Sequence, residues 1–305
     1  MPNILFRVDS SHQIGSGHTV RCLNLARKLR DCDFNVTFVA RSYVGNCNFL
    51  LEEEGFIVCS IPILNDAKNS AVLGNDYSAC LGVSQEMDAR ATILATGVRT
   101  YDWVIVDHYA LDYLWQDILR SITNNIMVID DLANRRHKCE ILLDQNFYLN
   151  KDERYLSLVP RECVSLLGPN YLLLSEQYDK YQLLEKVRSG VILRVLVFFG
   201  SVDLTRQTEL AITAITELNE SGITFDIIVG SSNPQKDTIR KRCTEHVNIN
   251  FHCQVDNMSD FISRADFALG AGGSSTWERC KLGLPTATVI VAENQREVTK
   301  NAAEI

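Results

Sequence analysis

Short apolar runs alternate with longer amphipathic stretches along the first half of the chain. Residues 4–8 and 35–40 are typical of buried strands, and residues 16–30 between them carry apolar side chains at helical spacing. The same criteria predict strands at 56–61, 103–107, 126–130 and 141–144, and helices at 49–54 and 86–96. Residues 65–85 are polar and weakly periodic, so we expect a loop with at most one helical turn. Strands alternating with helices indicate a parallel sheet covered on both faces.

The pattern changes at residues 150–190 and then begins again. Gly168 and Pro169 interrupt it, and residues 171–187 are predicted to form a charged helix. Further on, the pattern predicts strands at 191–199, 225–229, 249–252 and 267–269, and helices at 207–218, 236–245 and 258–264. A last helix starts near Arg296 and runs to Ile305 without a stop signal, so we expect it to be incomplete.

This alternation predicts an α/β protein with two Rossmann-like domains of the GT-B-like kind. We expect an N-terminal domain at 1–168, a connecting helix or linker at 169–190, and a C-terminal domain at 191–305. A length of 305 residues suits two domains. Ligands of such sheets bind at the carboxyl ends of the strands, so we expect the two domains to face a common cleft.

Composition narrows the classes of partner. A formal net charge of −8 argues against nucleic-acid binding and against docking on anionic lipid. No stretch approaches the roughly 18 apolar residues that span a bilayer. The ten cysteines are scattered without a Cys-x-x-Cys pair, which favours free thiols over disulfides or zinc. We therefore expect a cytoplasmic protein without a membrane or nucleic-acid partner.

The loop between the first strand and the first helix resembles a dinucleotide-binding loop only in part. Gly15 and Gly17 fit the first two glycines of that pattern, but Val20 occupies the third position. Arg41 stands at the end of the second strand, where such folds place an acidic residue. Binding of NAD is therefore weakly supported, and we expect no cofactor.

His18 lies at the start of the helix that follows this loop. The positive end of a helix dipole disfavours an imidazolium ion, so the ring should stay neutral and able to accept a proton near pH 7. A surface histidine that only caps the helix explains the spacing about equally well.

A second glycine-rich stretch, Gly-Ala-Gly-Gly, follows a predicted strand of the second domain. Gly272, Gly273 and the adjoining Ser274 allow a ligand to approach the backbone, and the next helix offers free N–H groups to a diphosphate. Ser275 and Glu278 also fit a capping box, in which both residues would only start the helix. The glycines are denser than a cap needs, which favours phosphate binding.

Gly200 permits a tight turn after the first strand of the second domain. Asp203 in this turn is equally suited to cap the next helix or to contact a ligand. In the first domain, Asp107 ends one strand, and Asp130 and Asp131 end another. Neighbouring carboxylates of this kind indicate a metal site or an acid/base pair, and an N-cap with a salt bridge is an equal alternative.

Several motifs together resemble the UDP-sugar hydrolases of pseudaminic acid biosynthesis, which in turn resemble glycosyltransferases of the GT-B fold. The matches follow one another in order along nearly the whole chain, and the stretch from Gly200 to Asp203 departs slightly from the Gly-Gly-x-Asp of many relatives. The matching residues are 5–18, 21–26, 129–131, 137–139, 142–146, 270–279, 282–285 and 292–297.

This resemblance implies the release of UDP from UDP-2,4-diacetamido-2,4,6-trideoxy-β-L-altrose, with His18 as the general base for water. Asp9 and Tyr109 are candidates to orient His18 or the sugar, and Glu278 is a candidate for the ribose hydroxyls. No metal is required if N–H groups of the glycine-rich loop hold the diphosphate. The expected substrate- or UDP-binding residues are Asp9, Gly15, Gly17, Tyr109, Gly200, Asp203, Gly272, Gly273, Ser274, Ser275, Glu278 and Asn294.

Two other functions fit the same fold. A UDP-sugar glycosyltransferase would need an acceptor, and a nucleotide-sugar sensor would bind without turnover. Release of UDP in the absence of any acceptor separates the hydrolase from both. We expect a monomer that binds a UDP-sugar.

Overall fold

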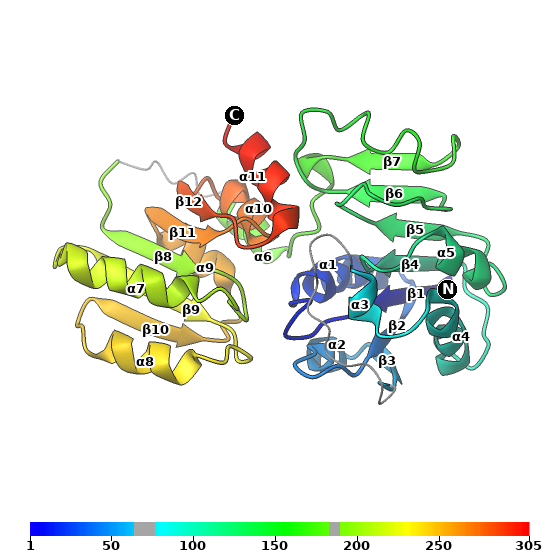
Figure 1. Ribbon diagram of the computed structural model, residues 1–305, viewed down its shortest axis with the longest axis horizontal. Coiled ribbons are helices and arrows are strands. Elements are labelled where there is room, and N and C mark those ends of the chain that lie inside the picture. The colour runs from blue at the N-terminus through cyan, green and yellow to red at the C-terminus, as the bar shows by residue number, and fades with distance from the viewer. Residues whose placement is uncertain (64–76, 183–189, 305) are drawn as a thin grey trace. The chain divides into compact units, whose positions relative to one another are not determined.

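The computed structural model describes residues 1–63, 77–182 and 190–304, and most of them form strands and helices of two α/β units (Figure 1). One unit is Met1–Leu173 with Lys300–Ile305, and the other is Leu174–Thr299. The division between Leu173 and Leu174 falls inside the segment where we expected the connection. Assignment of the last residues to the first unit was not predicted.

The first unit is built on a parallel seven-stranded sheet with the order β3-β2-β1-β4-β5-β6-β7. Apart from its last strand, this is the Rossmann order 3-2-1-4-5-6. The strands are β1 Asn3–Val8, β2 Asn35–Arg41, β3 Ile57–Ile61, β4 Trp103–Asp107, β5 Ile126–Ile129, β6 Ile141–Asp144 and β7 Val164–Leu167. The helices are α1 Gly17–Asp31, α2 Asn48–Glu53, α3 Ser78–Leu81, α4 Gln85–Ala95 and α5 Tyr113–Leu119, with a 3-10 turn η1 at Pro169–Tyr171.

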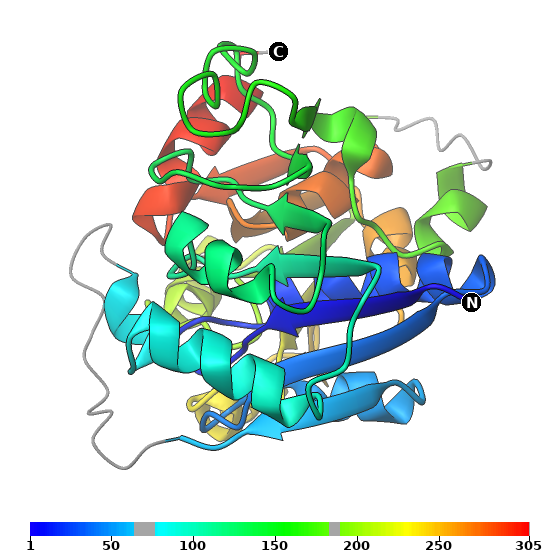
Figure 2. The ribbon, with the colours of Figure 1, turned by 90° about the vertical axis from the view of Figure 1, so that its right-hand side faces the viewer.

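Alternate side chains of β1 enter separate hydrophobic cores on the two faces of this sheet. Leu5 packs in the core that also contains Ala89 of α4 and Trp115 of α5, and Figure 2 shows these helices in front of the sheet. Phe6 packs in the opposite core with Leu23 of α1. Two covered faces explain why the strands are continuous apolar runs.

The second unit has a parallel five-stranded sheet with the order β10-β9-β8-β11-β12, which repeats the Rossmann order 3-2-1-4-5. Its strands are β8 Arg194–Phe198, β9 Thr224–Val229, β10 Ile249–Cys253, β11 Phe267–Ala271 and β12 Thr286–Val289. Its helical elements are α6 Gln177–Gln182, α7 Gln207–Leu218, α8 Lys236–Thr244, α9 Met258–Arg264, α10 Ser275–Lys281, η2 Glu293–Gln295 and α11 Arg296–Ala302. The two predicted Rossmann-like sheets are therefore confirmed.

Five elements differ from the sequence-based expectation. Only α6 is seen within the charged helix expected at 171–187, because residues 169–171 form a 3-10 turn; residues 183–187 lie outside the described range. α11 ends at Ala302 and does not continue toward Ile305. The short elements α5, β7 and β12 were not predicted, since none of them has a clear apolar period. The expected turn of helix is α3, while residues 65–76 lie outside the described range.

The structure also bears on membrane insertion and on disulfide bonds. Within the described ranges, no helix is both long and apolar enough to cross a bilayer. All ten cysteines are free thiols, as the sequence predicted.

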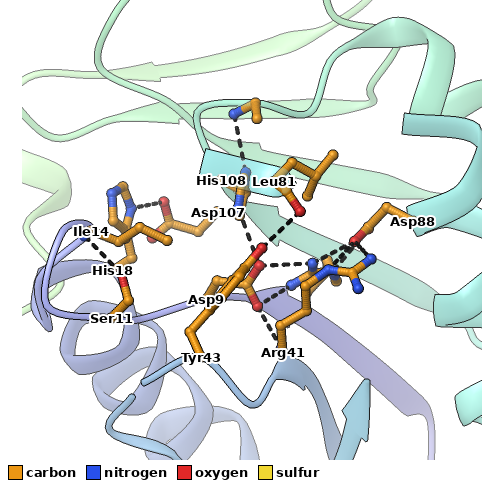
Figure 3. Close-up of polar contacts among 12 residues, drawn as sticks. Asp9, Ser11, Ile14, His18, Arg41, Tyr43, Leu81, Asp88, Asp107 and His108 are labelled. Atoms are coloured by element: carbon orange, nitrogen blue, oxygen red, sulfur yellow. Dashed lines mark hydrogen bonds and ion pairs between the residues drawn. The ribbon is translucent and has the colours of Figure 1, made fainter. Parts of the chain in front are cut away.

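A network of buried charges joins β1, β2 and α4 (Figure 3). The guanidinium group of Arg7 donates to Asp9 at 2.6 Å and to Asp88 at 2.8 Å. Arg41 also donates to Asp88, at 2.6 Å, and Trp115 donates its indole N–H to the same carboxylate at 3.0 Å. The side chains of Arg7, Asp9 and Asp88 are completely buried, so each charge depends on the others for compensation.

We predict that Asp88→Ala lowers the free energy of unfolding by about 3–5 kcal/mol, because Arg7 and Arg41 would remain buried without their shared partner. Urea unfolding measures the change. The control is Glu86→Ala on the same helix, since its exposed ion pair with Arg90 should contribute less than about 1 kcal/mol. Equal effects of the two substitutions would contradict a structural role of the network.

Candidate functional site

His18 is held in the first turn of α1 by an ordered loop after β1. The hydroxyl of Ser11 accepts hydrogen bonds from the backbone N–H groups of Gln13 and Ile14, and its carbonyl accepts one from Gly15. Gly15 has a φ of +78°, which a glycine adopts without strain. The side chain of His18 is 9% exposed. His18 is therefore not the surface residue that the alternative interpretation required.

The imidazole of His18 is oriented by Asp107 at the end of β4. Nδ1 lies 2.6 Å from Asp107 Oδ1 (Figure 3). Burial favours a raised pKa for Asp107, but the charge of Arg21 and the hydrogen bonds from Arg21 and His18 hold the pKa well below its usual range. An ionised carboxylate accepts the Nδ1 proton, which leaves Nε2 of the neutral ring free to accept another. The pair therefore has the geometry of a general base with its orienting carboxylate.

Arg21, one turn after His18 on α1, joins this pair to a second carboxylate. Its guanidinium group donates to both oxygens of Asp107, at 2.6 and 2.7 Å, and to Asp131 at 3.0 Å. Residues three apart share one face of a helix, so a single helix presents both the base and the cation to Asp107. Arg21 compensates the buried charge and fixes the position of the carboxylate.

Tyr109 lies directly beside His18, as the sequence suggested. The rings meet edge to face with centroids 4.5 Å apart, and the ring of Tyr77 also contacts Tyr109, with centroids 4.7 Å apart. Burial and the neighbouring charge of Asp131 raise the pKa of Tyr109, so its hydroxyl remains protonated at neutral pH. The tyrosine can shape the wall beside the base and donate a hydrogen bond.

Asp9 does not orient His18, contrary to one of its two expected roles. Its carboxylate is 1% exposed, accepts hydrogen bonds from Arg7 and from the backbone N–H of Arg41, and lies 3.2 Å from His108 Nε2. Asp107 has the orienting role instead. With both oxygens of Asp9 engaged inside the unit, we assign it to the support of the loop after β1, not to direct substrate contact.

Asp130 and Asp131 form ion pairs, and Asp130 also holds a loop. Asp130 lies 2.8 Å from Arg135 and accepts the backbone N–H of Ala133 at 3.0 Å, while Asp131 binds Arg21. No group of three His, Cys, Asp or Glu side chains among the described residues is arranged to hold a metal ion. The geometry thus favours the salt bridge of the alternative interpretation, but the expected N-cap is wrong, because no helix begins among the described residues that directly follow Asp130 and its contact with Ala133 holds a loop.

The carboxyl groups of Asp144 and Asp130 both contact the hydroxyl group of Tyr155. The Tyr155 hydroxyl lies 3.1 Å from an oxygen of each carboxylate. One hydroxyl proton can serve only one of them, so the second contact requires a protonated carboxyl group. Burial, with the nearby charges of Asp131 and Asp130, raises the pKa of Asp144 to about 7.

In the second unit, internal packing explains two glycines of the Gly-Ala-Gly-Gly stretch. A Cβ atom at Gly270 would lie 2.7 Å from the Arg279 guanidinium group, and one at Gly272 would lie 2.2 Å from Thr299 Oγ1. Gly273 has no such constraint, because the nearest atom to an added Cβ is 3.6 Å away. Only Gly273 therefore keeps the open backbone that the phosphate-binding interpretation invoked.

The residues that begin α10 do not form the capping box. Ser274 is the N-cap but makes no side-chain capping bond, and the Ser275 hydroxyl accepts from Arg279 at 3.0 Å. Glu278 is partly buried beside Tyr178. Burial raises the pKa of Glu278, against the opposing effect of the Tyr178 hydroxyl. Ser274 is exposed next to Gly273 and is free of a capping role.

Asp203 caps α7, one of its two expected roles. Its carboxylate oxygens accept the backbone N–H groups of Gln207 at 3.0 Å and Thr208 at 2.7 Å. Gly200 has a φ of +102°, so the turn after β8 uses the conformational freedom of glycine. Asn294 is partly exposed in η2. Gln295, the last residue of η2, lies near Gly272 and Gly273.

Both sets of residues lie at the topological switch point of their sheet. In the first unit, β1 and β4 are neighbours whose following loops run in opposite directions along the sheet, and they carry His18 and Asp107. In the second unit, β8 and β11 carry Gly200 and Gly273 in the same way. Ligands of open α/β sheets bind at this position.

Sequence reasoning missed Arg21 and the partnership of Asp107 with His18. Two signals were present: Asp107 ends a strand that the Rossmann order places beside β1, and Arg21 follows His18 by one helical turn. Gly17 is the first residue of α1 and, unlike Gly15, adopts no positive φ.

Comparison with known proteins agrees with these observations. The fold class is the GT-B-like, two-domain α/β fold, and residues 194–305 match the family model of the glycosyltransferase family 28 C-terminal domain. The chain is 25% identical to the UDP-2,4-diacetamido-2,4,6-trideoxy-beta-L-altropyranose hydrolase of Campylobacter jejuni, over 96% of this chain and 93% of that protein. The resemblance to this hydrolase family is thus confirmed.

Solved structures with low sequence identity share the fold. MurG of Acinetobacter baumannii is 14% identical with a TM-score of 0.58, covering 99% of this chain and 83% of that protein. A UDP-glucosyltransferase from Polygonum tinctorium is 14% identical with a TM-score of 0.60, covering 100% and 83%. These values support the fold.

We predict that the raised pKa of Asp144 makes the wild type less stable as the pH rises. Asp144→Asn should lack this contribution to the pH dependence. The folded-state pKa of Asp144, about 7, is above the ordinary value of 3.8, so its stabilising contribution is complete below pH ~4 and is lost through pH 7. The difference in unfolding free energy between variant and wild type should rise by up to about 4 kcal/mol from pH 4 to pH 8. Denaturant unfolding at several pH values measures it.

The matched control is Asp31→Asn, at an exposed position at the end of α1. Its pH profile should run parallel to that of the wild type. The assignment of a proton to Asp144 is wrong if Asp144→Asn also gives a parallel profile.

Proposed function

We propose that the protein hydrolyses a UDP-sugar to UDP and the free sugar, with His18 as the general base. The observation that carries the proposal is the hydrogen bond between His18 Nδ1 and Asp107 at the switch point of the first sheet. The named activity of the Campylobacter jejuni relative supports UDP-2,4-diacetamido-2,4,6-trideoxy-β-L-altrose as the substrate. A cytoplasmic, monomeric enzyme belongs to the same proposal.

The chemistry follows from the ionisation of the pair. Nε2 of His18 takes a proton from water as the water oxygen attacks the anomeric carbon, and the bond from that carbon to the UDP oxygen breaks. The imidazolium that forms is stabilised by the carboxylate of Asp107, whose position Arg21 fixes. Attack opposite the leaving group inverts the anomeric centre.

UDP must be held as an intact leaving group. We assign this to the second unit, where Gly273 leaves the backbone open and Ser274 is exposed beside it. Backbone N–H groups stabilise a diphosphate without a metal ion, so the proposed reaction needs none. Glu278 and Asn294 are the proposed contacts of the nucleoside, with Glu278 on the ribose.

A UDP-sugar glycosyltransferase is the second candidate, and the match of residues 194–305 to a glycosyltransferase domain favours it. The same base would then deprotonate a hydroxyl of an acceptor. Incubation with UDP-sugar and no acceptor decides between them, because only the hydrolase releases stoichiometric UDP. A sensor would bind the nucleotide-sugar and release none.

We predict that His18→Asn lowers turnover by about 100-fold or more and leaves the affinity for UDP within about threefold, because only the base is lost. Steady-state rates and calorimetric titration with UDP measure the two effects. The matched control is His252→Asn, which removes the imidazole of another histidine-aspartate contact, 3.1 Å from Asp226 in the second unit. Its turnover should stay within about twofold. Wild-type turnover in His18→Asn would remove this residue from the mechanism.

We predict that oxygen from labelled water enters the released sugar and not UDP. Attack on carbon leaves both phosphates of UDP untouched, whereas attack on phosphorus would give UMP and a sugar phosphate and would normally need a metal. The reaction is run in ¹⁸O-water with and without EDTA, and the products are weighed by mass spectrometry. Label in the nucleotide, or a tenfold loss of rate with EDTA, would overturn the mechanism.

A further inference from the structure

Two cysteines outside the candidate site lie in contact at the edge of the first sheet. Cys139 precedes β6 and Cys163 precedes β7, and these strands are paired neighbours with Ile141 opposite Val164. The two Sγ atoms are 3.7 Å apart and share a hydrogen bond. Cys139 is buried, whereas Cys163 is partly exposed. Cys163 is thus the partner that solvent can reach, and Cys139 is the buried partner next to it.

We propose that Cys139 and Cys163 form a reversible, oxidisable dithiol that closes to a disulfide on exposure to hydrogen peroxide. The Cys163 thiolate attacks a peroxide oxygen, the O–O bond breaks, and Cys163 becomes a sulfenic acid as water leaves. The sulfur of Cys139 then attacks the sulfenic sulfur. The S–S bond forms, the S–O bond breaks, and a second water carries away the Cys139 proton. Two thiols lose two electrons to one peroxide.

The order of attack follows from the surroundings of the two sulfurs. The hydrogen bond between the two sulfurs lowers the pKa of Cys163, while burial opposes this effect. The same hydrogen bond and burial raise the pKa of Cys139. A thiolate is the reactive form, so the exposed partner reacts first and the buried partner resolves it.

The bond would fasten a weakly held edge of the sheet. β7 is the last strand in the order, it pairs only with β6, and its first two residues, Val164 and Ser165, are exposed. A link between the segments that precede β6 and β7 restricts the unfolded chain and stabilises the folded pair. Oxidation therefore acts on β7, the strand that leads into η1 and the end of the first unit.

Peptide mapping of the intact chain tests the proposal. The folded protein is treated with a small excess of hydrogen peroxide, free thiols are alkylated, and a tryptic digest is analysed by mass spectrometry. We expect residues 139–151 joined to residues 162–180, two hydrogens lighter than the separate peptides, and separated again by dithiothreitol. The melting temperature of the oxidised protein should rise by roughly 5 °C.

Two single variants and one condition serve as controls. Cys163→Ser should abolish both the cross-link and the rise in melting temperature. Cys32→Ser changes an exposed cysteine just after α1 and should affect neither. Oxidation in urea should scatter the bonds among the ten cysteines. The proposal is overturned if the native protein gives no 139–163 link, or gives it no more often than other pairs do.

Discussion

The hydrogen bond between the buried carboxylate of Asp107 and Nδ1 of His18 is the interaction on which the candidate site depends. A carboxylate without solvent must be compensated, and Arg21 supplies the charge from the same helix that carries the histidine. The three groups therefore fix one another. Each needs the strand order that places the end of β4 beside the end of β1. The topology of the sheet thus determines which ring nitrogen remains available to accept a proton.

Several buried acidic side chains of the first unit have no part in the proposed hydrolysis. The charge of each is compensated in a different way. Asp9 and Asp88 share two arginines, while Asp130 has Arg135. Asp144 has Arg154 at 3.6 Å, but burial and the charges of Asp131 and Asp130 outweigh this cation and raise the pKa of Asp144 to about 7. Neutralisation by a proton is the expected response when a carboxylate is buried among other carboxylates. The site is therefore surrounded by rigid charge networks.

The two sheets could be predicted from the sequence, because nearly every long element keeps the apolar spacing of a buried strand or an amphipathic helix. The sequence was insufficient for α5 and β7, which are short and owe their existence to packing. For the site, His18 and Tyr109 could be predicted because both flank strand ends. The compensation of Asp107 by Arg21 depends on contacts 86 residues apart in the chain, which no local pattern reports. The glycine-rich stretch could not show by itself that phosphate binds there. Close packing against Arg279 explains the glycine at position 270 as well as a bound phosphate would.

A base of this kind does not by itself distinguish a hydrolase from a transferase. Nε2 of His18 can deprotonate water or a sugar hydroxyl, and the leaving group is the same in both reactions. The difference must come from what reaches the anomeric carbon. Tyr109 contacts the ring of His18 edge to face and also contacts Tyr77, so it is the aromatic neighbour of the base. The charge network of Asp107 would serve either nucleophile equally, and it therefore does not separate the two activities.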